Sequence, residues 1–341
     1  MRARAPASSA NLGPGFDALA LAVDRFVEVE VERASRLIVR SEGEGAGLND
    51  DAGHLAARVA IDVVGHDRLA VTVRSQIPVS RGLGSSAALA AAAAAAAGAR
   101  DPLAVAAHTD GHPENAAASV IGGLVAASTV RGKVMPVEMP FDPHLVIVAM
   151  VPDRSLSTTK ARQLLPAQVG LADAAFNLGR MGLLLAGLAD HRLLVREAGE
   201  DRLHQDYRSP LFPEAPMLLA ALVAGGALMA CWSGAGPTLL GFCPDAVGPR
   251  LEQAAKTAMA DAGVPGRVML LHAERAGLVT GDAARLPALA DDGTIPPLAR
   301  AVPSPPAESS GEGTGPLSPA QASPRAVRAT GSRIYDFDER E

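Results

Sequence analysis

The sequence predicts a layered fold of helices and sheets, in the α+β or α/β class. Of its 341 residues, 48% are hydrophobic but only 3% are aromatic. This composition suits a core of Ala, Val and Leu better than a stacking surface for nucleic acid. Alternating apolar and polar residues predict strands, and an alanine-rich run predicts a helix. The length indicates about two domains.

The predicted elements form two sets along the chain. In the first, FVEVEVE lies within an alternating stretch from Arg25 to Arg40, and VTVRSQI follows from Val71. Asp101 and Pro102 supply a cap and a first-turn proline for a short helix, which Gly111 and Pro113 should end. The strands of the second set are predicted in HLVIVAMVP from His144, GGALMACW from Gly225 and LLGFC from Leu239.

Charge and cysteine content exclude several classes of protein. The net charge is −6 and no Lys/Arg-rich block occurs, so no nucleic-acid partner is expected. Cys231 and Cys243 are too few for a disulfide framework, show no zinc-ligand spacing and are expected to be small buried residues. No signal peptide and no charge-free run long enough to span a bilayer is found, so we expect a cytoplasmic protein with no membrane partner.

The last part of the chain differs in composition. Residues 296–341 are rich in Pro, Ser, Gly and Ala and end in the acidic IYDFDERE. Such a segment lacks enough apolar side chains to offset its ordering entropy, so a disordered tail is predicted.

The most informative segment is IPVSRGLGSSAALAAAAAAAA, from Ile77 to Ala97. Gly82 and Gly84 let backbone N–H groups approach an anion, and the alanine run predicts a helix whose N-terminus points into the loop. No lysine follows Gly84, as a Walker loop requires, and the third glycine of a Rossmann fingerprint is absent. The pattern therefore predicts a different phosphate-binding loop; the alternative is a flexible turn before a buried helix.

Three separated segments carry a resemblance to a known family. They are PASSANLGPGFDALALAV from Pro6, the loop above, and WSGAGPTLLGF from Trp232. Together they resemble the signature motifs of the GHMP small-molecule kinases. Further segments, GHPENAAASVIGG, STTKARQLLPAQV and DRLHQDYRSPL, are most similar to the homoserine kinases within that superfamily. The resemblance extends from about residue 4 to about residue 275.

The resemblance implies an α+β fold of two domains. Residues 1–140 would form the N-terminal ATP-binding domain, with a left-handed βαβ unit, and residues 141–295 a ferredoxin-like C-terminal domain. The active site would lie in the cleft between them. Members of the family are often dimeric, so a homodimer is expected.

The resemblance also implies an ATP site, with Mg²⁺ as cofactor. Ser86, with Ser85 beside it, would face Mg²⁺ and the phosphates; for either serine the alternative is a helix cap. The family usually has Glu-Gly-His-Pro-Asp-Asn, whose glutamate binds the metal, whereas this chain has Asp110 there and Glu114 in place of the aspartate. Asp110 would reach Mg²⁺ through water. The ATP-binding residues would be Pro78, Val79, Ser80, Arg81, Gly82, Leu83, Gly84, Ser85, Ser86, Ala87 and Ala88.

The substrate implied by the resemblance is L-homoserine. Asn11 and Asp17 would contact it, Asp17 through the ammonium group, although both are also ordinary turn residues. Arg162 and Arg208 would hold the carboxylate, which suits a guanidinium fork; either alone could be a surface charge. Thr158 would be a further substrate contact.

The GHPEN segment would contact the reacting end of homoserine. His112 would bind substrate, and Asn115 would lie near the hydroxyl and act catalytically together with Ser86. The alternative for Asn115 is a helix cap. His108 and His112 have the spacing of a metal pair, but Gly111 between them argues against one helical face and hence against zinc.

The expected activity is ATP-dependent phosphorylation of the homoserine hydroxyl. Two alternatives remain open. One is a GHMP kinase for another small alcohol, such as mevalonate or a sugar. The other is a catalytically weak nucleotide-binding regulator, suggested by Asp110. Trp232 would narrow the cleft or pack in the core, and Ser233–Pro237 would lie beside the nucleotide loop or simply form a tight turn.

Overall fold

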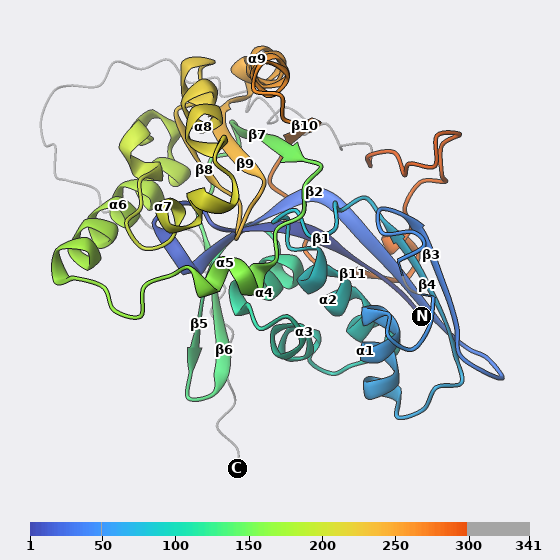
Figure 1. Ribbon diagram of the computed structural model, residues 1–341. Helices are drawn as coiled ribbons and strands as arrows, with labels where there is room; N and C mark the ends of the chain where they lie inside the picture. Colours follow the sequence, from blue (N-terminus) through green and yellow to red (C-terminus); the bar gives the residue numbers. More distant parts are fainter. Residues whose placement is uncertain (49, 299–341) are drawn as a thin grey trace, which may run out of the picture. The chain divides into compact units, whose positions relative to one another are not determined.

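Two β-sheets with helices against them make up the described chain, a computed structural model that covers residues 1–48 and 50–298 (Figure 1). Residues 1–297 form one compact unit. The first sheet has the order β11-β1-β2-β4-β3, and β5 pairs with β2 and β6. Its strands are β1 Arg2–Asn11, β2 Gly15–Arg33, β3 Ile38–Gly43, β4 Leu69–Ser75, β5 Leu124–Val130, β6 Lys133–Met139 and β11 Val279–Thr280.

The predicted strand from Arg25 to Arg40 is two strands. β2 ends at Arg33, and β3 starts at Ile38 and runs parallel to β4. The alternation breaks in this connection, where Ser35 and Arg36 are both polar and residues 37–39 are all apolar, but no Gly or Pro marks the turn. The prediction was therefore wrong in its boundary, whereas the strand predicted from Val71 lies within β4 as expected.

Four helices pack near the first sheet. They are α1 Leu55–Val64, α2 Ser85–Ala97, α3 Pro102–Asp110 and α4 Pro113–Ile121. Nine alanines of α2 are buried, and this helix contacts β1, β2 and each of the other three helices. Alanine side chains permit this close packing on all sides. The predicted caps of α3 are confirmed: the Asp101 side chain accepts from the Ala104 N–H, and Gly111 ends the helix with φ 75°.

The second sheet is antiparallel, in the order β10-β7-β9-β8. Its strands are β7 Leu145–Pro152, β8 Met229–Trp232, β9 Leu239–Pro244 and β10 Gly266–Leu271. With helices between β7 and β8 and between β9 and β10, this is the ferredoxin-like arrangement. The α+β class predicted from the sequence is confirmed, with two separate sheets.

The remaining helices surround this sheet and its approach to the first. They are α5 Thr158–Gln163, α6 Leu171–Ala189, α7 Gln205–Arg208, α8 Ala215–Ala224 and α9 Gly248–Asp261. Short 3₁₀ turns occupy His191–Leu193, Arg196–Gly199, Ser209–Leu211, Asp245–Val247 and Gly281–Ala284.

Strand β7 joins the two hydrophobic cores. All eight of its residues are buried; Leu145, Ile147 and Ala149 belong to the core under the first sheet, whereas Val146 and Val148 belong to the core under α8 and α9. This alternation is the two-residue period of a strand buried on both faces.

After β10 the chain returns to the first sheet. Strand β11 pairs with β1, and the Arg74 side chain donates to the Leu286 carbonyl at 3.0 Å. Ile295 is buried. The domain boundaries expected at residues 140 and 295 remain predictions, and residues 299–341 of the expected tail lie outside the described chain.

Candidate active site

Residues of the first sheet and its helices, with connections between strands of the second sheet, line one cavity of about 830 Å³. Its wall includes the β1–β2 turn, the loop before α2, the starts of α4 and α5, and the end of α7. The structure brings together in this wall all the residues expected to contact substrate or metal. These are Asn11, Asp17, Ser86, Asp110, His112, Asn115, Thr158, Arg162 and Arg208.

Most of the predicted nucleotide loop also faces the cavity. Residues 79–86 line it, whereas Pro78 lines a smaller adjoining cavity of about 540 Å³. Ala87 and Ala88 are fully buried behind the loop. These two alanines would therefore contribute backbone rather than side chains to any ligand site.

The two glycines of the loop are required by its geometry. Both have positive φ, 81° for Gly82 and 62° for Gly84. A Cβ on Gly82 would lie 2.4 Å from the Ser233 carbonyl oxygen, and one on Gly84 would lie 2.1 Å from Ser8 Oγ. Larger residues would push the loop away from these neighbours.

Helix α2 presents unpaired N–H groups to the cavity. Its N-cap is Gly84, which makes no side-chain cap bond, and its first backbone bond joins the Ala88 N–H to the Gly84 carbonyl at 3.0 Å. The N–H groups of Ser85, Ser86 and Ala87 thus have no partner within the helix. Neither serine is the N-cap, so the capping alternative is wrong and both hydroxyls line the cavity. This is the geometry of an anion site.

The Ser233–Pro237 segment lies directly beside this loop. Ser233 Oγ donates to the Gly82 carbonyl at 2.6 Å and bonds Ser9 Oγ at 2.8 Å. Trp232 does not line the cavity; it is buried and its ring meets Phe212 edge-on at 6.0 Å. Of the two interpretations of Trp232, core packing is the one observed.

Asn11 and Asp17 shape the β1–β2 turn in the cavity wall. Both have positive φ, 71° and 51°, which is uncommon for residues other than glycine and is often found at functional sites. Asn11 Oδ1 accepts from the Asp17 N–H at 3.1 Å, and Asn11 Nδ2 donates to the Gly234 carbonyl at 2.9 Å. This amide ties the turn to the Ser233–Pro237 segment.

Arg162 is paired with Asp17. Its Nη2 lies 2.8 Å and 2.9 Å from the two carboxylate oxygens. The hydrogen bonds to Asp17 raise the pKa of Arg162 further above its ordinary value. Arg162 is therefore not an isolated surface charge.

Arg208 is a buried cation held by neutral partners. Its Nη1 donates to the Gly234 carbonyl at 2.7 Å and to His204 Nδ1 at 3.0 Å, whereas its Nε has no partner. Burial lowers the pKa of Arg208 to about 10 and that of His204 to about 4. Arg208 is thus charged and His204 neutral near pH 7, and His204 Nε2–H donates to the Gly13 carbonyl at 2.8 Å. An unpaired donor on a buried guanidinium favours an anionic ligand.

A network behind α7 fixes this arginine. The Asp201 carboxylate accepts from the N–H groups of Leu203, His204 and Gln205 at 2.7–2.9 Å and from Asn177 Nδ2 at 3.0 Å. The backbone leading into α7 is therefore rigidly held, which positions the Arg208 guanidinium.

Phe16 is a site residue that the sequence did not indicate. Its ring stacks on His204 with centroids 5.1 Å apart, and the guanidinium carbons of Arg162 and Arg208 lie 5.7 Å and 5.8 Å from its centroid. Both guanidinium groups are within cation–π distance of this ring, which attracts them electrostatically.

The GHPEN segment starts helix α4. Its N-cap is His112, so Asn115 lies inside the first turn and is not the cap. Asn115 Oδ1 accepts from Ser8 Oγ at 2.9 Å. Gly111 separates His108 on α3 from His112, and among the described residues these histidines join no metal-ligand group. The zinc interpretation is not supported.

The two acids of this segment have different environments. Asp110 contacts His112 Nδ1 through its carbonyl at 3.0 Å and its carboxylate at 3.4 Å, which raises the pKa of His112. Glu114 is 1% exposed, and burial raises the pKa of its carboxyl to about 7. The local sequence gave no signal for this burial.

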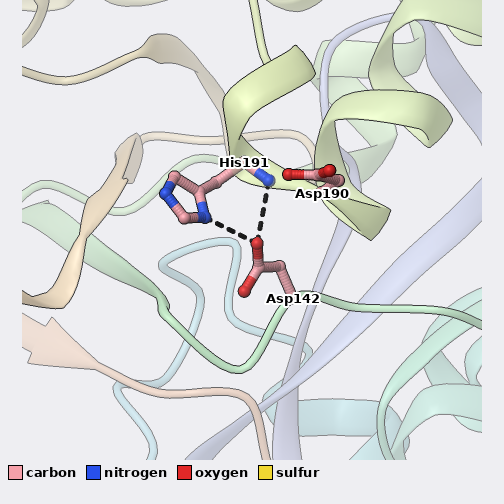
Figure 2. A group of neighbouring side chains, drawn as sticks. All are labelled: Asp142, Asp190 and His191. Carbon is pink, nitrogen blue, oxygen red and sulfur yellow. Dashed lines mark hydrogen bonds and ion pairs between the residues drawn. The ribbon is translucent and has the colours of Figure 1, made fainter. Parts of the chain in front are cut away.

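One group with the composition of a metal site lies away from the cavity. Figure 2 shows Asp142, Asp190 and His191, whose potential ligand atoms lie within 4.8 Å of one another. Asp142 Oδ2 already accepts from the His191 N–H at 2.8 Å and from His191 Nδ1 at 2.6 Å. These bonds join the turn after α6 to the residues before β7, which is a structural role.

Comparison with known proteins identifies the family. The sequence matches the GHMP kinases N terminal domain over residues 52–123 and the GHMP kinases C terminal domain over residues 175–261. With these matches and the relatives described next, the chain belongs to the GHMP kinase family.

The curated relatives of the chain carry the name homoserine kinase. One from Moorella thermoacetica is 38% identical over 255 residues, which cover 70% of this chain and 86% of the relative. Another, from Mycolicibacterium vanbaalenii, is 42% identical over 263 residues, 69% and 82% of the two chains.

Solved structures share the fold. The crystal structure of homoserine kinase from Cytophaga hutchinsonii has a TM-score of 0.72 at 25% identity and covers 82% of this chain and 96% of that one. A structure of L. major mevalonate kinase in complex with R-mevalonate has a TM-score of 0.62 at 14% identity, over 81% of this chain and 97% of that one, and shows likeness of fold alone.

Proposed function

We propose that this GHMP kinase is a homoserine kinase, which transfers the γ-phosphoryl group of ATP to the hydroxyl of L-homoserine. The product is O-phospho-L-homoserine, an intermediate of threonine biosynthesis. The relatives at 38% and 42% identity support this activity. The observation that carries it in the structure is a single cavity whose lining includes both a phosphate-type loop and the charges Arg162, Arg208 and Asp17.

These three charges match an amino acid. Arg208 and Arg162, which both line the cavity, would offer guanidinium groups to the α-carboxylate. Asp17 offers a carboxylate to the ammonium group. When the zwitterion binds, Asp17 exchanges Arg162 for the ammonium group of the ligand, and Arg162 exchanges Asp17 for its carboxylate. Each side chain therefore keeps an opposite charge beside it.

The residues of the loop act on the phosphates. The N–H groups at the start of α2 and the hydroxyls of Ser85 and Ser86 would bind the β- and γ-phosphates and stabilise the charge that develops on them. Asn115 would orient the homoserine hydroxyl in line with the γ-phosphorus. The bond between the γ-phosphorus and the oxygen that bridges it to the β-phosphate breaks as the bond between the homoserine oxygen and the γ-phosphorus forms. The hydroxyl proton is released. No strong base is needed, because the attacking oxygen carries little charge in a loose transition state.

The donor set at this end of the cavity suits Mg²⁺. Ser86 and Asp110 offer the oxygen ligands that this hard cation prefers, and Glu114 lies in the same wall. Bound Mg²⁺ would supply charge neutralisation on the phosphates. Asp110 is about 1.5 Å shorter than the family's glutamate, so we propose that it holds the ion through water.

Two further properties belong to the proposal. We propose a homodimer, in keeping with the resemblance stated above. We also propose a cytoplasmic location, since Cys231 and Cys243 are both free and buried.

The activity can be tested by identifying the product. Purified protein with Mg²⁺, ATP and L-homoserine should form a phosphate monoester with the ³¹P NMR shift and mass of O-phospho-L-homoserine. ATP consumption that is independent of homoserine, with inorganic phosphate as the sole product, would instead support the nucleotide-binding regulator.

A further inference from the structure

Helix α6 has an outer face with no charged or polar side chain. Its exposed residues fall on one side, whereas Asn177, Leu184, Gly187 and Leu188 are buried on the other. Figure 1 shows the helix at the margin of the described chain. The α6 outer face consists of Leu171, Ala172, Ala175, Leu178, Gly179, Gly182, Leu183, Ala186 and Ala189.

The charged side chains of α6 are all held away from this face. Asp173 pairs with Arg202 at 3.1 Å, and Arg180 pairs with Glu200 at 2.8 Å. Leu171 and Leu178 remain 87% and 74% exposed. A continuous uncharged surface of this kind usually marks an interaction site.

The small residues of the face are spaced for helix–helix contact. Ala172, Ala175, Gly179, Gly182, Ala186 and Ala189 alternate steps of three and four residues along the helix. This is the spacing of the two contact positions of a coiled coil, at which one helix faces another along its whole length. Alanine and glycine at these positions allow a close approach of the two backbones.

The order of small and large residues on the α6 outer face is the same from either end of the helix. About the midpoint between Arg180 and Met181, Gly179 corresponds to Gly182 and Leu178 to Leu183. Ala175 then corresponds to Ala186, and Ala172 to Ala189. A two-fold axis at this midpoint would bring each residue of one copy against its counterpart in an antiparallel second copy. A surface that is complementary to itself is what a two-fold dimer requires.

We propose that the α6 outer face is the interface of a homodimer, in which the two α6 helices pack antiparallel about a two-fold axis at residues 180 and 181. The proposal specifies the surface for the homodimer proposed above and does not depend on the identity of the substrate. The occupant of the face is a second copy of this chain.

The area available is of the right order. A helix of 19 residues is about 28 Å long and about 10 Å wide, so its outer face covers roughly 300 Å². Exposed Leu164 and Val169 precede the helix, and exposed Leu193 and Val195 follow it. To reach the ~800 Å² per partner of a standard interface, the proposed dimer would also bury these flanking residues.

A bilayer fits this helix less well, although α6 is long and apolar enough to cross one. Its inner side carries Asn177, which donates to Asp201, and the ion pairs of Asp173 and Arg180. Insertion would break these contacts or carry them into hydrocarbon. Contact on one side alone, as in a dimer, leaves them intact.

The first test is the mass of the full chain in solution. Sedimentation equilibrium should give twice the chain mass of 34.7 kDa. Leu178→Glu and Gly182→Leu should each raise the dimer dissociation constant at least ~100-fold, the first by burying a charge against Leu183 of the partner subunit and the second by separating the backbones. Both positions are exposed, so the subunit fold should be kept, as circular dichroism would verify. Val137→Glu, at an exposed residue of strand β6, is the matched control and should remain dimeric.

The second test determines which residues of the two α6 helices lie opposite each other. Ala175→Cys mixed with Ala186→Cys should form a disulfide between chains under mild oxidation, whereas each variant alone should not, because its two copies would lie far apart. Several results would overturn the proposal: a monomeric native chain, dimers retained by both face variants, cross-linking of Ala175→Cys with itself, partition into phosphatidylcholine vesicles, or dimerisation only after removal of residues 299–341. Homoserine phosphorylation measured on the same samples reports on the proposed function separately.

Discussion

Arg162 and Asp17 form an ion pair in the wall of the cavity, with both carboxylate oxygens within 2.9 Å of Arg162 Nη2. The two residues are 145 positions apart and come from helix α5 and strand β2. Both side chains are more than a third exposed, so the pair itself adds little to stability. Its consequence is that two opposite charges are placed where a zwitterion can separate them.

The ammonium contact of Asp17 can be tested by removing its charge. Asp17→Asn should raise the KM for L-homoserine about 10- to 100-fold and leave the KM for ATP within about twofold, because a charge-assisted hydrogen bond contributes about 1.5–3 kcal/mol. Steady-state kinetics in both substrates would measure this. Glu252→Gln, which removes a partly exposed ion-pair carboxylate on α9, is the control. Equal increases in both KM values would contradict a role at the homoserine end alone.

Arg208 is expected to bind the carboxylate. Arg208→Ala should raise the KM for homoserine by an order of magnitude or more, and Arg208→Lys should restore only part of it, because lysine lacks the Nε and Nη geometry of the guanidinium. Arg154→Ala removes an arginine paired with Glu214 and serves as the control. An unchanged KM in Arg208→Ala would remove this residue from the site.

The metal-side role of Asp110 predicts opposite effects of two substitutions. Asp110→Asn should weaken Mg²⁺ dependence and activity severely, since a neutral amide does not offset the charge of the cation. Asp110→Glu should keep or raise activity by restoring the length of the family's ligand, unless the added methylene clashes. Mg²⁺ titrations of activity, with calorimetry of Mg²⁺–ATP binding, would separate these effects. Native behaviour of Asp110→Asn would exclude the role and direct attention to Glu114.

The buried carboxyl of Glu114 should make the free energy of unfolding depend on pH. Its carboxyl has a pKa of about 7 in the folded chain against an ordinary 4.5, so between these values the folded protein keeps a proton that the unfolded chain releases. The free energy of unfolding should therefore fall as pH rises through this window, by up to about 3 kcal/mol from this group. Glu114→Gln should flatten the dependence in ATP-free protein, as urea unfolding at pH 5 to 8 would show. Parallel curves for the variant and the native chain would argue against a buried, protonated Glu114.

The sequence was sufficient to predict loops and helix starts that depend on neighbouring residues. Gly82, Gly84 and the alanines behind them specify a loop and a helix start within a few residues, and the Asp101-Pro102 start of α3 was read correctly for the same reason. The resemblance of the motifs then identified the fold class and the residues that meet in the cavity.

Contacts between distant segments were not predictable in this way. The stacking of Phe16 on His204, the Asp17–Arg162 pair and the burial of Glu114 depend on how the β1–β2 turn meets α5 and α7. The boundary between β2 and β3 was missed because the turn contains no Gly or Pro, although the alternation breaks at Ser35 and Arg36. The spacing of residues within one segment does not indicate which distant segments come into contact.

The most direct test of the assignment is a comparison of kcat/KM for L-homoserine, mevalonate and galactose under saturating Mg²⁺ and ATP. The cavity charges predict a preference for L-homoserine of at least ~100-fold over either alternative, because neither carries both an ammonium and a carboxylate group. A higher kcat/KM for mevalonate or galactose would contradict the assignment.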